Sequence, residues 1–150
     1  MTARPQNRLQ TNALCAELTP AQIDKLACLA RSEHHTAGTF VFREGELATD
    51  LYLIDAGRVG LELCSPRGVH TIDTLDRDDA LGLSWMYPGA RWLFDARATE
   101  PLDLVVIDGQ RLHALCEQDT DLGMRLMRAM AREVIERLQA TRARLLDFYR

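Results

Sequence analysis

The sequence lacks long hydrophobic runs. Its longest unbroken apolar stretches extend over a few residues only, whereas a membrane-spanning helix needs about 20. The first 14 residues carry two arginines and no apolar core of a secretory signal. We therefore expect no membrane partner and a cytoplasmic location.

The sequence also has few cysteines, and their spacing matches no metal or redox motif. The four residues are Cys15, Cys28, Cys64 and Cys116. None forms a C-x-x-C pair, which argues against a zinc ribbon and a dithiol redox centre. We expect reduced cysteines that pack as small hydrophobes. A redox sensor or a set of cluster ligands is the alternative.

Lysine is nearly absent, and basic residues are in the minority. Lys25 is the only lysine, and 18 basic residues face 22 acidic ones, for a net charge of −4. This balance argues against direct nucleic-acid binding. Seven arginines lie between residues 125 and 150, where we expect a solvated helix face. A chain that is 47% hydrophobic and 27% charged is typical of one globular domain.

The spacing of apolar residues along the chain changes from a helical to an extended pattern and then back to a helical one. Residues 1–18 indicate a loose N-terminal arm. Thr19 and Pro20 are typical of a helix start, and we expect this helix to end near Arg31. Short strands are then predicted up to Asp108, at 39–42, 51–54, 59–64, 69–75, 93–98 and 102–107. Such short strands, with turn signals between them, indicate a sandwich or a barrel-like roll.

Two helices are predicted after Gly109. The first covers residues 110–117, and the second runs from Asp119 or Asp121 to about Phe148, a rod of about 40 Å. Its apolar residues recur near the 3.5-residue period of a two-stranded seam. The predicted seam residues are Met127, Met130, Val134, Leu138, Thr141 and Leu145. We expect a parallel homodimer, with no part of the roll beneath the helix beyond Val134.

Five short motifs follow one another between residues 37 and 108. They lie at 37–46 (AGTFVFREGE), 51–59 (LYLIDAGRV), 81–82 (LG), 96–101 (ARATEP) and 106–108 (VID). Together they resemble the cyclic nucleotide-binding domains of the cyclic AMP receptor protein and Fnr (Crp/Fnr) superfamily, over residues 18–149. The resemblance implies an α+β fold, with an antiparallel, jelly-roll-like β-roll of about eight short strands. It implies an N-terminal arm (1–18), the roll with short helices (19–118) and a long C-terminal dimerisation helix (119–150).

The resemblance also implies where a ligand would bind. In the family, a Gly-Glu pair opens the phosphate cassette, its glutamate accepts a ribose hydroxyl, and a later arginine pairs with the cyclic phosphate. Here the pair is Gly82-Leu83, Trp92 occupies the arginine position, and Arg91 precedes it by one residue. The candidate ligand-binding residues are Gly82, Leu83, Ser84, Trp85, Arg91, Trp92, Phe94 and Ala96.

These departures predict a regulatory, non-enzymatic sensor with a degenerate cassette that binds cyclic AMP, cyclic GMP or another small ligand weakly. Trp85, Tyr87, Trp92 and Phe94 could form an apolar pocket for a planar ligand. They could equally fill the core or form a surface for a protein partner, which would make the chain a ligand-free interaction module. The helix-turn-helix of the related transcription factors does not follow, so we expect a stand-alone regulatory domain.

Two other kinds of site stay open. A haem sensor could use His70, His113 or Cys116 as axial ligands. A cupin-like metal site could combine His34 or His35 with His70 and with Glu44 or Glu46. The cupin spacing of His-x-His followed by Glu is absent, and neighbouring strand residues point to opposite faces.

Overall fold

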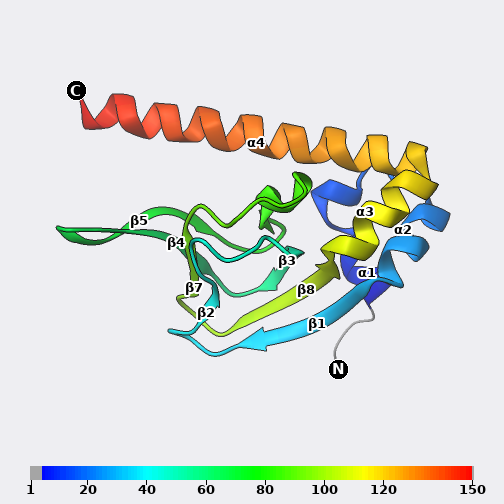
Figure 1. Ribbon diagram of the computed structural model, residues 1–150, viewed down its shortest axis with the longest axis horizontal. Helices are drawn as coiled ribbons and strands as arrows, with labels where there is room; N and C mark the ends of the chain where they lie inside the picture. Colours follow the sequence, from blue (N-terminus) through cyan, green and yellow to red (C-terminus); the bar gives the residue numbers. More distant parts are fainter. Residues whose placement is uncertain (1–4, 150) are drawn as a thin grey trace.

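The computed structural model of the chain describes residues 5–149 and has the predicted α+β architecture (Figure 1). Two four-stranded antiparallel sheets form the roll, and a long helix runs along one side of it. The first sheet has the order β1 (Ala30–His35), β8 (Leu102–Asp108), β3 (Asp50–Ala56), β6 (Ala80–Leu81). The second has the order β2 (Phe40–Phe42), β7 (Asp95–Ala98), β4 (Val59–Ser65), β5 (Gly68–Leu75). The helical elements are α1 (Pro5–Gln10), η1 (Ala13–Cys15), α2 (Pro20–Ala27), η2 (Leu83–Met86), α3 (Gly109–Gln118) and α4 (Thr120–Phe148).

The predicted start of α2 is confirmed, but its predicted end is wrong. The Gln22 amide donates to Thr19 Oγ1 at 3.2 Å, and the Thr19 amide donates to Gln22 Oε1 at 2.9 Å. This capping box satisfies backbone donors at the helix start. The helix ends at Ala27, and Ala30 and Arg31 instead open β1 against β8. The sequence of β1, ARSEHH, gives no apolar alternation because this edge strand is largely exposed.

The first sheet separates two hydrophobic clusters. Successive strand residues point to opposite faces, so β3 and β8 contribute to both. Leu51 and Val105 belong to the cluster beneath the helices, which we call the helical cluster. Tyr52 and Val106 belong to the cluster inside the roll, which we call the roll cluster. A displacement of this sheet would therefore change the packing of both clusters.

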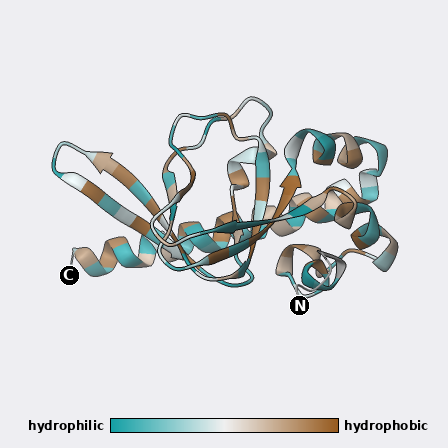
Figure 2. Cartoon of the chain, turned by 90° about the horizontal axis from the view of Figure 1, so that it is seen from below, coloured by the Kyte–Doolittle hydropathy of each residue, from teal (hydrophilic) through white to brown (hydrophobic). Residues whose placement is uncertain are grey.

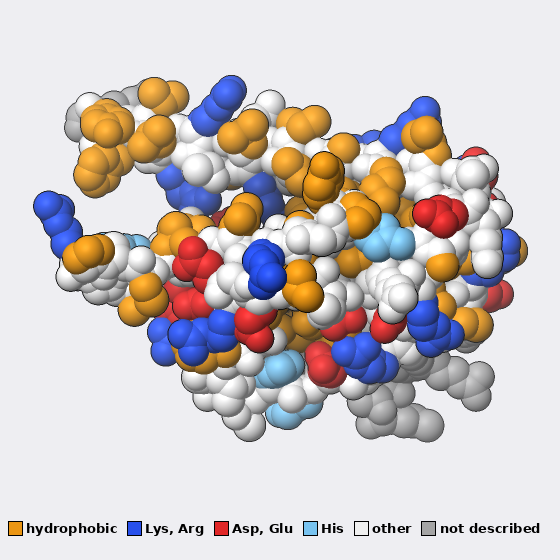
Figure 3. Space-filling model, viewed as in Figure 1, with side chains coloured by type: hydrophobic (Ala, Val, Ile, Leu, Met, Phe, Trp, Pro, Cys, Tyr) orange, Lys and Arg blue, Asp and Glu red, His pale blue; other side chains and the backbone are white. Residues whose placement is uncertain are grey.

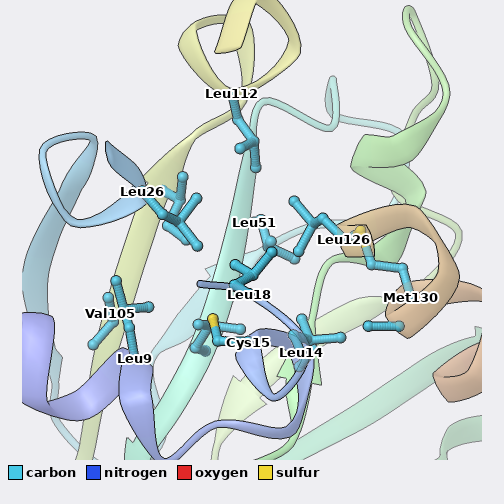
Figure 4. Close-up of a cluster of buried hydrophobic side chains, with 14 of the residues drawn as sticks. Leu9, Leu14, Cys15, Leu18, Leu26, Leu51, Val105, Leu112, Leu126 and Met130 are labelled. Atoms are coloured by element: carbon cyan, nitrogen blue, oxygen red, sulfur yellow. The ribbon is translucent and has the colours of Figure 1, made fainter. Parts of the chain in front are cut away.

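The segment before Thr19 is not a loose arm where the structure describes it. Leu9, Leu14, Cys15 and Leu18 are buried in the helical cluster, beside residues of α2, β3 and α4 (Figure 4). Burial raises the pKa of the Cys15 thiol to about 12, as expected for a cysteine that packs as a hydrophobe. The segment has a polar composition overall, but its few apolar side chains pack into the core and hold it in place. Residues 1–4 lie outside the described residues.

The predicted long helix is confirmed as α4, but one residue of its predicted seam is wrong. Asp119 caps the helix by accepting the Leu122 amide at 3.0 Å. Met130 is fully buried in the helical cluster (Figure 4), so it cannot lie on an exposed seam. Val134, Leu138 and Leu145 are exposed, as the prediction requires.

The expectation that no roll lies beneath the second half of α4 is also wrong. Arg137 donates to the carbonyl of Ala80 at the end of the first sheet. Arg144 donates to the carbonyl of Ile72 at 3.1 Å, and its guanidinium lies 3.6 Å from the Asp73 carboxylate. The β4–β5 hairpin therefore lies beneath this part of α4 (Figures 1 and 2).

Among residues 5–149, no helix combines the length and the apolar character needed to cross a bilayer.

Candidate functional site

The candidate cassette begins where β6 ends. Gly82 has φ of 88°, in the left-handed region, and leads into η2. A Cβ atom at this position would lie 2.9 Å from the Trp92 ring and 3.1 Å from the carbonyl oxygen of Asp50. Glycine is therefore required both for the turn and for the close approach of Trp92.

Trp92 occupies the interior of the roll. Only 3% of it is exposed, and its ring stacks on Phe42 with centroids 4.0 Å apart and planes 11° apart. Tyr52 is tilted against it at 6.2 Å, and Phe94 lies partly buried beside Phe42 at 5.9 Å. Ala96 is fully buried on β7 in the same roll cluster. The side chain that the resemblance places at the phosphate-arginine position is thus part of a close-packed aromatic core.

Arg91 does not reach this interior. Its guanidinium is exposed and donates to the carbonyl of Gly45 at 2.7 Å. The Trp92 backbone pairs with the same turn through Glu46 O and Gly45 N, each at 2.9 Å. Because adjacent residues in an extended segment point to opposite sides, the inward Trp92 places Arg91 outside. A phosphate in the roll would not meet this guanidinium, which corrects the predicted role of Arg91.

The predicted pocket residues separate into different environments. Trp85 is 1% exposed and belongs with the buried Leu83 to the helical cluster, not to the roll cluster of Trp92. Tyr87 is 78% exposed. Ser84, partly exposed, accepts the Tyr87 amide through its carbonyl at 3.2 Å. The structure therefore does not unite Trp85, Tyr87 and Trp92 around one ligand.

A salt-bridged pair on the outer face of the second sheet was not found from the sequence. Arg97 forms a bidentate pair with Glu62, with both N–O distances 2.7 Å. The Glu62 hydrogen bond and charge raise the pKa of Arg97. Arg97 lies on β7 next to the inward Ala96, so its side chain faces outward. Only the pairing of β4 with β7 brings Glu62 to it, and no local motif records that pairing.

The histidines and cysteines do not gather into a metal site. His34 lies 2.8 Å from Asp103, His70 2.9 Å from the Ser65 hydroxyl, and His113 3.1 Å from the carbonyl of Trp85. Within residues 5–149, no three histidine, cysteine or acidic side chains are grouped so that they could hold a metal ion. All four cysteines are free, and burial raises the pKa of Cys116.

The cyclic nucleotide-binding domain matches residues 32–119, which is more than half of the chain. The chain belongs to this family. Its two antiparallel sheets, N-terminal helix and long C-terminal helix are consistent with the fold of this family. No curated protein matches the sequence significantly.

Solved structures share this fold. A cyclic nucleotide-binding protein of Geobacter metallireducens GS-15 is 29% identical, with a TM-score of 0.80 over 92% of this chain and 99% of that one. The sensor domain of the transcriptional regulator DNR from Pseudomonas aeruginosa is 20% identical, with a TM-score of 0.72 over 89% and 91%. The regulatory subunit of a cAMP-independent protein kinase A from Trypanosoma cruzi, bound to guanosine, is 21% identical. Its TM-score is 0.63 over 69% of this chain and 37% of that one.

Proposed function

We propose that the chain is a non-catalytic regulatory domain whose roll is closed to cyclic nucleotides, and that it acts as a homodimer joined through α4. Its output would be contact with a protein partner. The observation that carries the proposal is the position of Trp92, buried and stacked on Phe42 inside the roll. A nucleotide would have to displace this indole before it could enter.

The charges also disfavour a cyclic phosphate in the roll. The side chains of the roll cluster are apolar or aromatic, with Tyr52 contributing the one hydroxyl. Burying an ionised group without a partner costs several kcal/mol or more. Two candidate cations are engaged elsewhere, because Arg91 binds the Gly45 carbonyl outside the roll and Arg97 binds Glu62 on the outer face. Leu83, at the position of the family's ribose-binding glutamate, offers no acceptor.

Calorimetry with cyclic AMP and cyclic GMP tests the closed roll. We expect no saturable heat and no change in melting temperature up to about 1 mM nucleotide, which corresponds to a binding free energy weaker than about −4 kcal/mol. Saturable binding by the wild-type protein would contradict the proposal. If that binding were then lost in Arg91→Ala, the site predicted from the sequence would be supported instead.

The exposed face of α4 supports the dimer. Hydrophobic side chains gather along this helix and at its C-terminal end (Figure 3). The buried Met130 leaves the stripe, and the exposed Ala131 takes its place. The spacing then alternates four and three residues, as in a two-stranded seam. The corrected seam is Met127, Ala131, Val134, Leu138, Thr141 and Leu145.

Thr141 fits such a seam despite its hydroxyl. The hydroxyl donates to the carbonyl of Arg137 at 2.8 Å within α4, so contact with a partner would not leave this donor unsatisfied. Val134, Leu138 and Leu145 are 42%, 51% and 55% exposed. A contiguous apolar stripe of this kind is typical of a protein interface.

Light scattering on seam variants tests the dimer. We expect the wild type to have about twice the 16.9 kDa chain mass, and Val134→Glu with Leu138→Glu to be monomeric because like charges would meet across the seam. Leu146→Glu is the matched control, since Leu146 is 65% exposed on another face of α4. A monomeric wild type, or a double variant that stays dimeric, would contradict this seam.

A further inference from the structure

The two halves of α4 are attached to the rest of the chain in different ways. The buried residues of the helix all lie in its first half, and they are Leu122, Gly123, Leu126, Ala129 and Met130. No side chain of residues 131–149 is buried, although this part of the helix runs above the β4–β5 hairpin (Figure 1). We call residues 131–148 the distal arm. Because hydrophobic burial ends at Met130, polar contacts must hold the distal arm against the roll.

Two arginines make such contacts, one with each sheet. Arg137 donates to the carbonyl of Ala80 in β6, an edge strand of the first sheet. Arg144 donates at 3.1 Å to the carbonyl of Ile72 in β5, an edge strand of the second sheet. Edge strands expose backbone groups that no neighbouring strand pairs. Each guanidinium therefore supplies a donor to a carbonyl at the rim of the roll.

Acidic side chains surround these two arginines. Glu133 lies 3.5 Å from Arg137 within α4, and Asp79 faces the same guanidinium from the turn between β5 and β6. The Asp79 carboxylate also accepts the Asp76 amide at 2.9 Å. The other charged groups that act on Asp79 and Glu133 are all acidic, and they are Asp73, Asp76 and Glu136. Arg144 is 3.6 Å from Asp73. Five carboxylates thus share two guanidiniums, which leaves a surplus of negative charge where the arm meets the roll.

The surplus charge affects how Asp79 and Glu133 bind protons. Partial burial raises the pKa of both carboxyls above their ordinary values of 3.8 and 4.5, and the neighbouring acids add to this. The charge of Arg137 acts in the opposite direction and does not offset the burial. A raised pKa in the docked arrangement means that docking is favoured when the two groups are protonated. This preference is complete below the ordinary pKa values and is lost as pH rises through the raised ones.

We propose that the distal arm is a hinged segment that Arg137 and Arg144 latch to the roll, and that ionised Asp79 and Glu133 loosen the latch. The hinge follows Met130, where the buried side chains end. A helix of this length is marginally stable in water without packing, so an unlatched arm would fray or swing away. The inference goes beyond the proposed function and does not depend on it, because every contact of the latch lies within one chain.

Hydrogen exchange measured by mass spectrometry tests the latch. All samples, the reference included, carry Val134→Gln and Leu138→Gln, two exposed positions, so that a dimer seam cannot protect the arm. Arg137→Ala with Arg144→Ala should speed exchange in residues 131–148 at least about fivefold and leave residues 120–130 unchanged. Alanine favours a helix more than arginine does, so a purely local effect would slow exchange instead.

The exposed Arg142 lies on the same arm, and Arg142→Ala is the matched control. It should leave the exchange of the arm within about twofold of the reference. Unchanged exchange in the arm of the Arg137 and Arg144 double variant, or an equal increase along the whole of α4, would overturn the proposal. If the proposed dimer does not form, the two glutamine changes remove no protection and the test is unaffected.

Neutral variants test the role of the two acids. Asp79→Asn with Glu133→Gln keeps an oxygen that can accept the Asp76 amide but removes both charges. At about pH 7.5 this variant should exchange about two- to fivefold more slowly in the arm than the reference, and the difference should disappear towards about pH 4. Comparison at equal pH cancels the intrinsic pH dependence of exchange. Glu100→Gln, at an exposed acid in the β7–β8 turn, should have no effect. Faster exchange in the neutral variant, or a difference that does not change with pH, would overturn the proposal.

Discussion

Removing the Trp92 ring should open a cavity in the roll at a measurable cost in stability. A tryptophan buries about 150–250 Å², and at about 25 cal/mol per Å² this corresponds to about 4–6 kcal/mol, part of which an alanine keeps. The side chain is 3% exposed and stacked on Phe42, so nearly all of this area is buried in the folded state and becomes exposed to water on unfolding. We expect Trp92→Ala to lower the free energy of unfolding by about 3–5 kcal/mol.

Thermal and urea unfolding, followed by circular dichroism, measure this loss. For a chain of this size 1 kcal/mol shifts the melting temperature by about 2–4 °C, so a drop of about 6–20 °C is expected. Tyr87→Ala is the matched control, because Tyr87 belongs to the same cassette but is 78% exposed. It should change the free energy of unfolding by less than about 0.5 kcal/mol.

A ligand that refills the cavity should reverse part of the effect. Indole has the shape of the deleted group, and apolar cavities in proteins bind such molecules. At about five times its dissociation constant, indole should return about 1 kcal/mol to Trp92→Ala and nothing to the wild type. A loss below about 1 kcal/mol would refute the filled roll. Binding of cyclic AMP to Trp92→Ala without indole, when its cavity is open, would refute the charge argument.

Three further predictions concern local structure. Gly82→Ala should cost at least about 2 kcal/mol, measured by urea unfolding, because its φ of 88° is strained for alanine and its Cβ would meet Trp92 at 2.9 Å. Thr19→Ala removes the capping box of α2 and should cost about 1 kcal/mol in the same assay. The bond from the Leu122 amide and the contact with Lys25 lower the pKa of Asp119 below its ordinary 3.8. Its carboxylate therefore stabilises the fold fully above that value and loses this effect as pH falls through the lower folded pKa, so the melting-temperature difference between wild type and Asp119→Asn should shrink from about pH 6 to about pH 2.

The parts of the fold that local sequence determines were predicted. Thr19 and Pro20 start α2, Asp119 caps α4, and residues 65–68 join β4 to β5, because each depends on neighbours a few residues away. Strand β1 was missed because its pairing with β8 is a long-range contact and its exposed face carries no apolar pattern. The structure of the segment before Thr19 was predicted wrongly for a related reason. Leu9 and Leu14 look isolated in sequence, and only the tertiary core shows that both are buried.

The sequence grouped Trp85, Arg91 and Trp92 around one ligand, whereas the structure places them in three different environments. The resemblance places Trp92 at the family's arginine position and Arg91 beside it, but the motif order could not tell which of these two adjacent residues points inward. The structure answers this through the pairing of Trp92 with Gly45 and Glu46, 46 or more residues away. Met130 was assigned to the seam for a similar reason. A stripe of helical spacing contains both core and surface residues, and only packing against the helical cluster separates Met130 from Ala131.

The two tryptophans lie in different clusters, with consequences for signalling. Trp92 lies in the roll cluster, and the first sheet separates that cluster from the helices. Trp85 lies in the helical cluster and contacts His113 of α3 directly, and α3 packs against α4. A change in the position of α3 can therefore reach α4 and its predicted seam without crossing the sheet. A group in the roll would have to move β3 or β8 first, and the close packing of Trp92 on Phe42 resists that movement.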